Sequence, residues 1–282
     1  MESILKFPRT PHLEGSRLQE GDDASAQVPY SHLNGKYIVV EEKMDGANSG
    51  VRFNQHPALM LQSRGHYLLG GGRERHFNLL KSWAAYREDM LFDILGTRHL
   101  MYGEWCHAKH TVFYDRLPHY FIEFDILDTE TGAFLSTARR RALIGDAPVV
   151  QAPVLYEGIA PRQLKDLLSF IRPSLAKSED WLASLRAVAE RHGLDVERAV
   201  AETEGSALAE GLYIKVEENG VVTERYKWVR RDFLQTLMDS DSHWLSRPII
   251  PNQLAPGVSL FDDVLVPWGG KSAQLPATHA MA

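Results

Sequence analysis

The chain has 282 residues, a formal net charge of −6 at pH 7 and a hydrophobic fraction of 44 %. These values are typical of a globular protein with one large domain or two small ones. A charged fraction of 24 % with 10 % aromatic residues excludes global disorder, and no stretch approaches the roughly 18 consecutive apolar residues of a membrane span.

The cysteine content and the N-terminus indicate a cellular compartment. The single cysteine, Cys106, cannot form an intramolecular disulfide, and residues 1–10 lack the apolar core of a secretory signal. We therefore expect a cytoplasmic protein. Because the chain is mildly acidic, any contact with nucleic acid must come from local basic patches.

Runs rich in β-branched and aromatic residues predict strands at 37–40, 51–53, 58–62, 100–104 and 120–128. Two further strands, 211–217 and 221–229, flank Asn219-Gly220, a dipeptide typical of a tight hairpin turn. In the first of these two strands Lys215 alternates with apolar residues, so we expect it to point away from the core.

Apolar residues at helical spacing predict helices mainly within a helical insertion at about 161–204. One run ends at Pro173, and another has Ser178 as its N-cap and Gly193 as its stop. An earlier helix is expected over 75–95. Strands interrupted by one helical insertion predict a single α+β domain over 1–240, followed by a Pro- and Gly-rich C-terminal tail at 241–282.

The most informative segment is Lys43-Met44-Asp45-Gly46, which comes directly after the first predicted strand. A lysine amine attacks phosphorus only when it is deprotonated. Its pKa, ordinarily about 10.4, must therefore be lowered by burial or by neighbouring cations. Taken alone, this tetrapeptide is more typical of a surface turn, so its meaning depends on the segments downstream of it in the chain.

Five such segments occur after Lys43 in a definite order. They are Ser-Arg-Gly at 63–65, Tyr-Gly-Glu at 102–104, Phe-Ile-Glu-Phe-Asp-Ile at 121–126, Glu-Gly-Leu-Tyr-Ile-Lys at 210–215 and Arg-Tyr-Lys-Trp-Val-Arg at 225–230. In order and approximate spacing, the six resemble motifs I, Ia, III, IIIa, IV and V of the covalent nucleotidyltransferases. The chain thus resembles the polynucleotide ligase and capping-enzyme superfamily from about Glu42 to Arg230.

Within that superfamily the chain looks most like the ATP-dependent RNA ligases of the nick-sealing phage type and their bacterial relatives, because Asn48 stands five residues after Lys43. Only 52 residues come after Arg230, whereas an OB-fold needs about 70 to 100. We expect an α+β nucleotidyltransferase domain, ATP-grasp-like, with antiparallel sheets, flanking helices and no OB-fold.

The resemblance implies a three-step reaction in RNA repair. The amine of Lys43 attacks the α-phosphate of ATP to form a lysyl-AMP, AMP passes to a 5′-phosphate RNA end, and a 3′-hydroxyl RNA end then displaces it. ATP, with AMP bound covalently, and Mg²⁺ or Mn²⁺ are the implied cofactors. RNA with these two ends is the implied partner; no membrane is implied, and protein partners stay open.

The resemblance also implies roles for individual residues. Lys215 and Lys227 clamp the α-phosphate oxygens, because the charge on the transferring phosphoryl group must be neutralised. Glu104 and Glu210 contact the ribose or hold the metal, mostly through water, and Asp45 joins that water shell. Hard oxygen ligands and retained waters are what Mg²⁺ prefers.

Further residues are assigned to the nucleotide and to the RNA ends. Phe124 stacks on adenine, and Glu42 accepts a hydrogen bond from the adenine amino group, which favours ATP over GTP. Arg64 reaches the ribose or an RNA phosphate, and Asn48 positions the RNA ends. In motif V, Arg225 replaces the first lysine of the family pattern, and either Arg225 or Arg230 serves as the second cation.

One basic run and three alternative functions remain. Arg139-Arg140-Arg141 contacts nucleic-acid backbone or lies on a solvated helix face. A minimal ATP-dependent DNA ligase and a GTP-dependent capping-type guanylyltransferase are disfavoured by the missing OB-fold. A noncatalytic nucleotide-binding relative has little need for Lys43, Lys215 and Lys227 together.

Overall fold

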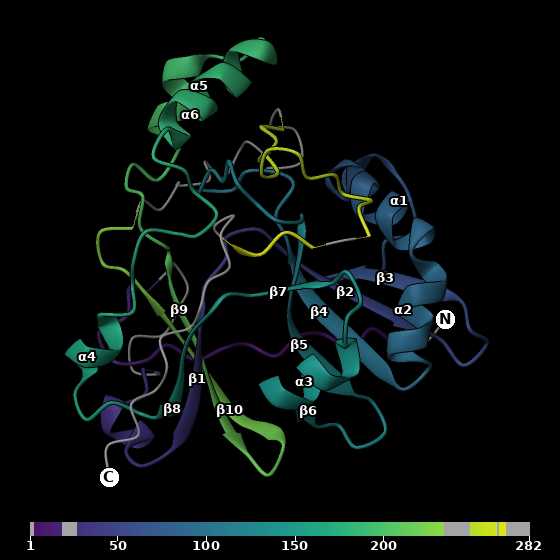
Figure 1. Cartoon of the computed structure of the whole chain (residues 1–282), viewed down its shortest axis with the longest axis vertical. Coiled ribbons are helices and arrows are strands. Elements are labelled where there is room, and N and C mark those ends of the chain that lie inside the picture. Colours follow the sequence, from purple (N-terminus) through teal and green to yellow (C-terminus); the bar gives the residue numbers. More distant parts are fainter. Residues whose placement is uncertain (1–2, 19–26, 234–248, 264, 269–282) are drawn as a thin grey trace.

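The computed structural model describes residues 3–18, 27–233, 249–263 and 265–268 (Figure 1). One ten-stranded sheet, in the order β3-β2-β4-β5-β6-β10-β9-β1-β8 with β7 paired to β5, connects the two halves of the molecule. Its strands are β1 Tyr37–Glu42, β2 Ala47–Phe53, β3 Leu59–Ser63, β4 His99–Trp105, β5 Phe121–Asp128, β6 Phe134–Leu135, β7 Val150–Gln151, β8 Val154–Ile159, β9 Gly211–Glu218 and β10 Val221–Val229.

All neighbouring strands are antiparallel except β5 and β7. This confirms the α+β class, the antiparallel sheet with flanking helices and all seven predicted strands, within a few residues at their ends. Asn219 and Gly220, which join β9 to β10, have φ values of 51° and 80°. Positive φ at both positions is what a type I′ hairpin turn requires.

The helices are short and lie outside the sheet. They are the 3-10 helices η2 Tyr30–Leu33 and η3 Gly72–Phe77, and the α-helices α1 Asn78–Tyr86, α2 Glu88–Leu95, α3 Thr137–Ile144, α4 Leu164–Leu168, α5 Trp181–Arg191 and α6 Val196–Ala201. Figure 1 shows α1 and α2 beside the β2–β4 half, α4 beside the β8 and β1 half, and α5 with α6 projecting at one end.

Two helix predictions were wrong in detail. The helix expected over 75–95 breaks at Arg87, whose guanidinium donates to the carbonyls of Phe261 and Asp262 at 2.7 and 2.8 Å. Ser178 does not cap α5, which begins at Trp181. Its backbone N–H and its hydroxyl instead donate to Asp115. In both places a distant partner, invisible to local patterns, decides the local structure.

Sequence patterns also missed the segment from β6 to β8. There α3 and three short strands lie between the predicted strand 120–128 and the helical insertion. Two of these strands have only two residues, too few for a periodic signal, and β8 is partly exposed along its length. Tertiary pairing with β1, β5 and β10 therefore decides their conformation.

Separate hydrophobic cores support the two halves. In one, α1 and α2 pack on β2, β4 and β5 around Trp83, Trp105 and Phe121. In the other, Ile38 and Ile214 lie among the apolar residues of β1, β9 and α4. The strand ends that carry the candidate site are thus held from behind by two independent cores.

Part of the predicted C-terminal tail packs on the domain. The Asn252 side chain is buried; its Oδ1 accepts from the Tyr114 amide at 2.9 Å and its Nδ2 donates to the Cys106 carbonyl at 2.7 Å. Residues 234–248, 264 and 269–282 of the region predicted as domain end and tail lie outside the described residues. Across the described ranges, no helix has the length and apolar character needed to cross a bilayer.

Candidate active site

A cavity of about 1340 Å³ lies between the two halves of the sheet. Residues of β1, β2, β4, β5, β9 and β10 line it, together with the N-terminal segment, the loop before η3 and the start of α6. The residues predicted for the site that line this cavity are Glu42, Lys43, Asp45, Asn48, Arg64, Glu104, Phe124, Glu210 and Lys227. The six sequence motifs therefore converge on one place.

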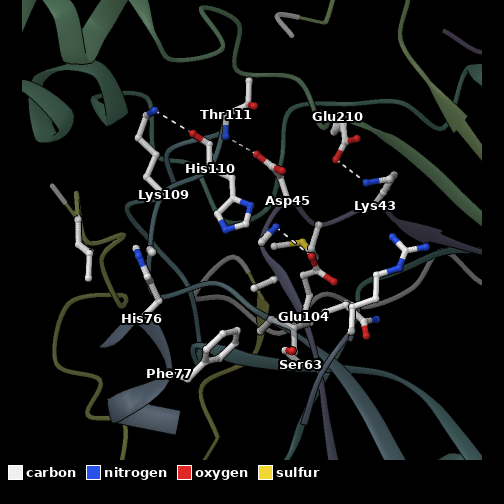
Figure 2. Close-up of a pocket in the computed structure, with 18 of the residues that line it drawn as sticks. Lys43, Asp45, Ser63, His76, Phe77, Glu104, Lys109, His110, Thr111 and Glu210 are labelled. Carbon is white, nitrogen blue, oxygen red and sulfur yellow. Dashed lines mark hydrogen bonds and ion pairs between the residues drawn. The ribbon is translucent and has the colours of Figure 1, made fainter. Parts of the chain in front are cut away.

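Lys43 immediately follows β1 and extends into this cavity (Figure 2). Its Nζ lies 2.7 Å from Oε2 of Glu210, which precedes β9, and 26 % of the Lys43 side chain is exposed. The Gly46 amide donates to Glu104 of β4 at 3.1 Å, and a Cβ at Gly46 would lie 2.7 Å from the Trp105 carbonyl oxygen. Only glycine lets the Lys43 loop approach β4 this closely.

The charge around Lys43 differs from the expectation. Burial favours the neutral amine, but the carboxylates of Glu210, Glu104 and Asp45 outweigh burial and raise the pKa of Lys43. The expected lowering by burial or cations is thus wrong for the protein without nucleotide. The physical reason is that three acids face one base, so the ammonium form is the stable one.

Two of these acids also have raised pKa values. Burial raises the pKa of Glu104 to about 8, against the lowering effect of Lys43, and burial likewise raises the pKa of Glu210 to about 7. Lys227 contributes a smaller lowering effect on Glu210. Two buried acids facing one ammonium leave an excess of negative charge in the site when both are ionised.

Asp45 has a different environment from the other two acids. Its Oδ2 accepts hydrogen bonds from the backbone amides of Thr111 and Val112, both at 2.7 Å, and its own amide donates to the Tyr114 hydroxyl at 2.9 Å. Figure 2 shows that the same loop carries Lys109 and His110 on the cavity wall, near His76 and Phe77. Asp45 therefore holds this wall in place.

Within the part of the chain that the structure describes, no three His, Cys, Asp or Glu residues are arranged to bind a metal directly. The fit with a metal rests on donor chemistry: the buried, raised-pKa carboxyls of Glu104 and Glu210 are hard oxygen ligands that lack a full counter-charge. Such groups suit Mg²⁺ or Mn²⁺ held mostly through water.

The strand register places a row of polar side chains on the sheet face of Glu41, the residue two before Lys43. Glu41 of β1 lies opposite Tyr213 of β9, which lies opposite Lys227 of β10. Two residues further along β9, Lys215 lies opposite Arg225 of β10. Directly opposed residues share a face, so Tyr213, Lys215 and Lys227 lie on one face of the hairpin, as the alternation in its sequence predicts.

The prediction that Lys215 points away from the core was wrong. Its side chain is fully buried and does not line the cavity. Its Nζ donates to Glu41 Oε1 at 2.8 Å and to the Phe124 carbonyl. β5 covers this end of the hairpin face, and buried acids compensate the lysine charge. Lys215 therefore lies behind the cavity wall.

Arg140 completes this buried network. Its guanidinium donates to Glu41 and to Glu123, both at 2.7 Å, and only 1 % of its side chain is exposed. The Arg139-Arg140-Arg141 run therefore does not form one solvated face, because its middle member is in the interior. Arg141 pairs instead with Glu157 on the surface at 2.6 Å.

The two candidate arginines of motif V lie outside the cavity lining. Arg225 is 3.7 Å from Asp125, and its guanidinium lies 4.0 Å from the ring centre of Phe134. Arg230 is buried and donates to the Ala209 carbonyl, just before Glu210, at 2.7 Å. Arg230 thus supports the backbone that carries Glu210, and the expected second phosphate-binding cation is not placed in the cavity by either arginine.

The residues predicted to contact the base are both in the cavity lining. The Phe124 ring meets those of Phe7 and Tyr213 edge to face, at 5.1 and 5.9 Å between ring centres. Glu42 lies on the opposite face of β1 from Lys43, and its carboxylate accepts from the Ser174 hydroxyl at 2.5 Å and the Leu175 amide at 3.4 Å. Both Glu42 oxygens therefore already have partners.

The residues predicted to face the RNA ends both line the cavity. Asn48 of β2 lies opposite Glu104 of β4. Its Oδ1 is buried and has no hydrogen-bond partner among the described residues. Arg64 follows β3 and is exposed at the cavity. An unpaired buried acceptor beside a buried acid of the site is a place where a ligand donor fits.

Sequence reasoning missed several residues that shape the site. Phe7, Thr10, Tyr213 and His110 line the cavity, and Arg140 and Glu123 lie behind it. Phe7 and Thr10 precede the first motif and carry no local signal. Tyr213 alternates with apolar residues on β9 in the same way as Lys215, so the sequence pattern could have identified this one residue.

Comparison with known proteins gives the family of this chain. A sequence profile of the RNA ligase family matches residues 36–229. Because this match covers more than half of the chain, the chain belongs to the RNA ligase family. The matched region begins just before β1 and ends with β10, so it contains all the sheet strands.

Several solved structures are similar at low identity. A variant of the Naegleria gruberi RNA ligase with ATP and Mn is 16 % identical, with a TM-score of 0.46, and the match covers 71 % of this chain and 51 % of that one. Another variant with ATP and Mn is 15 % identical, with a TM-score of 0.46 and coverage of 81 % and 61 %. The chain spans about half the length of the first of these proteins. No curated protein matches the sequence.

Proposed function

We propose that this protein is an ATP-dependent RNA ligase of the covalent nucleotidyltransferase type, which joins 3′-hydroxyl and 5′-phosphate RNA ends in RNA repair. The observation that carries the proposal is the position of Lys43. It extends from the end of a core strand into the large cavity where the motif residues converge, and it lies within hydrogen-bond distance of a buried acid.

In the first step the neutral Lys43 amine attacks the α-phosphorus of ATP. A nitrogen–phosphorus bond forms, the bond to pyrophosphate breaks, and the amine loses a proton. Glu210 Oε2, 2.7 Å from Nζ, is placed to receive that proton, and a pKa of about 7 makes this carboxyl a suitable base near neutral pH. The phosphoramidate keeps the activation energy of ATP for the later steps.

Before this step Lys43 must release its proton against a raised pKa. The acids that raise it are the same acids whose excess negative charge suits a divalent cation. Glu104 and Glu210 would hold Mg²⁺ or Mn²⁺ through water, and the bound ion supplies positive charge beside the transferred phosphoryl group. Lys227, which lines the same cavity as Lys43, adds a cation of the chain itself.

The later steps use the same cavity. AMP leaves Lys43 for the 5′-phosphate of one RNA end, and the 3′-hydroxyl of the other end then attacks and releases AMP. Phe124 offers a stacking face for adenine, and Asn48 and Arg64 offer a hydrogen-bond acceptor and a cation to the RNA ends. A volume of about 1340 Å³ has room for both a nucleotide and a strand end.

Transfer of label tests the proposal. The protein is incubated with Mg²⁺ and with α-labelled ATP or GTP, followed by denaturing electrophoresis and mass spectrometry of the Lys43 peptide. We expect one AMP on Lys43 from ATP, and none in Lys43→Ala or Lys43→Arg, because a guanidinium stays protonated. Lys36→Ala is the matched control, since Lys36 precedes the same strand and pairs with Glu224 outside the cavity.

Each other outcome contradicts a part of the proposal. Label from GTP alone favours a capping-type guanylyltransferase, and no covalent label from either nucleotide favours a noncatalytic relative. Label that persists in Lys43→Ala removes Lys43 as the nucleophile. Efficient sealing of all-DNA nicks by the labelled protein favours a minimal DNA ligase.

A further inference from the structure

The N-terminal segment, residues 3–18, lies outside the region that matches the RNA ligase family, yet it forms part of the cavity wall. Its backbone pairs with the edge of β10. The Lys227 amide donates to the Pro11 carbonyl at 2.9 Å, and the Leu13 amide donates to the Lys227 carbonyl at 3.0 Å. The segment is therefore fixed beside a cavity-lining lysine of the site.

The other end of this segment is fixed to the opposite half of the sheet. The Leu5 carbonyl accepts from Gln62 Nε2 of β3 at 2.7 Å and from the Tyr102 hydroxyl of β4 at 2.8 Å. Between Leu5 and Pro11 the chain crosses from one half of the sheet to the other. Because both ends of this short crossing are hydrogen-bonded, the side chains within it have defined positions.

Phe7 is the aromatic residue within this crossing. It is only 8 % exposed, it lines the cavity, and its ring meets that of Phe124 edge to face at 5.1 Å with an interplanar angle of 88°. A second edge-to-face contact, with Tyr102 at 5.0 Å and 67°, supports the ring from behind. The cavity thus has two perpendicular aromatic walls at one end, provided by β5 and by the N-terminal segment.

We propose that Phe7 is a base-binding residue, which together with Phe124 forms a pocket for the purine of the nucleotide. The proposal rests on the proposed function for the choice of ATP as ligand. A base that stacks parallel to Phe124 lies perpendicular to the Phe7 ring, the relative orientation of an edge-to-face contact. Stacked and edge-to-face contacts are the two arrangements that aromatic rings favour, and this corner provides both to one base.

Binding in the absence of chemistry tests this role. ATP binding is measured by calorimetry in the Lys43→Met variant, which cannot form the phosphoramidate, alone and combined with Phe7→Ala or Phe7→Leu. We expect ATP to bind about 3- to 30-fold more weakly with Phe7→Ala, and Phe7→Leu, which keeps apolar volume without an aromatic face, to lose affinity as well. Inorganic tripolyphosphate, which has no base, is expected to bind all of these proteins equally.

Phe134→Ala is the matched control. The Phe134 ring lies 5.7 Å from that of Phe7 in the same aromatic cluster, but Phe134 does not line the cavity. We expect its removal to lower thermal stability while leaving ATP affinity within about twofold. If both Phe7 variants bind ATP as the parent does, or if Phe134→Ala weakens ATP as much as Phe7→Ala, the proposal is wrong.

These outcomes are separate from the fate of the proposed function. If the wild-type chain is not labelled by ATP but still binds ATP in a Phe7-dependent manner, the ligase mechanism fails and the base pocket stands. If the chain is labelled at Lys43 and Phe7 has no effect on ATP affinity, the ligase mechanism stands and the base pocket fails.

Discussion

The Nζ atom of Lys43 and the Oε2 atom of Glu210 lie 2.7 Å apart, although 167 residues separate them in the chain. Three per cent of the Glu210 side chain is exposed, so this ion pair is shielded from water on the Glu210 side. The contact joins the end of β1 to the start of β9. It makes Glu210 both the main stabiliser of the Lys43 ammonium and the nearest acceptor for its proton.

Glu210→Gln is expected to slow AMP transfer to Lys43 by about 10² to 10³, because it removes a positioned charge and the proton acceptor. It also removes a group that raises the pKa of Lys43, so the amine should react with an acylating reagent at lower pH than in the wild type. Label transfer and mass spectrometry of the Lys43 peptide across pH measure both effects. Glu218→Gln, an exposed acid of the same strand, is the control; wild-type transfer in Glu210→Gln contradicts the assignment.

Glu104→Gln is expected to change how stability depends on pH. The pKa of the Glu104 carboxyl is raised from 4.5 to about 8 in the folded chain, chiefly by burial. The folded state therefore holds a proton that the unfolded state releases, and this contribution to the free energy of unfolding is full below about pH 4.5 and is lost as the pH rises through about 8. The variant cannot ionise, so its melting temperature relative to wild type should rise between pH 5 and pH 8.5.

Glu88→Gln, which removes an exposed acid at the start of α2, serves as the control for that measurement. Its melting temperature should follow that of the wild type throughout the same pH range. A Glu104→Gln difference that is constant with pH would show that Glu104 is ionised in the folded chain at all of these pH values.

Arg140→Met is expected to lower the free energy of unfolding by about 3–5 kcal/mol, because it leaves Glu123 buried without its main cation and removes one of the two cations that pair with Glu41. Urea denaturation at neutral pH measures the change. Arg139→Met, the exposed neighbour on the same helix, should change stability by less than about 0.5 kcal/mol. Equal effects of the two substitutions would mean that the buried network contributes nothing beyond a surface arginine.

Asn48→Ala and Arg64→Ala are expected to impair the sealing of RNA ends more than the adenylylation of Lys43, because both residues line the cavity and are assigned to the RNA ends and not to the nucleotide. One nicked duplex made in four versions, with RNA or DNA on each side of the nick, measures joined product for each variant. We expect sealing to need ribonucleotides on the 3′-hydroxyl side, since A-form duplexes display 2′-hydroxyls that B-form DNA lacks.

Arg191→Ala, an exposed arginine at the end of α5 that does not line the cavity, is the control for these sealing measurements. If Asn48→Ala loses adenylylation as severely as sealing, Asn48 belongs to the nucleotide pocket instead. Equal joining of all-DNA and RNA-ended nicks would contradict the proposed preference of the enzyme for RNA.

Local patterns predicted the elements that carry strong local signals. The hairpin of β9 and β10 is an example, because Asn219-Gly220 adopts positive φ with little cost and the alternation on β9 fixes which residues share a face. Most of the predicted site residues line one cavity, because each motif lies on a strand or at the end of one.

Burial and charge balance could not be predicted in the same way. Lys215 has the same alternation as a solvated lysine, and only the contacts with Phe124 and Asp125 of β5 make it a buried partner of Glu41. The pKa of Lys43 was expected to fall, yet it rises because Glu104 and Glu210, both distant in sequence, face it. Electrostatic shifts depend on distances in space, which the order of residues does not contain.

The sequence by itself determined the class of fold, the order of the site motifs and the nucleophile candidate, because strand alternation, turn chemistry and short motifs act over a few neighbouring residues. The tertiary structure alone decided which cations reach the cavity, which are buried behind it, and that Phe7 from outside the matched region lines it. These properties arise where segments far apart in the chain meet, and packing there sets both solvent access and charge.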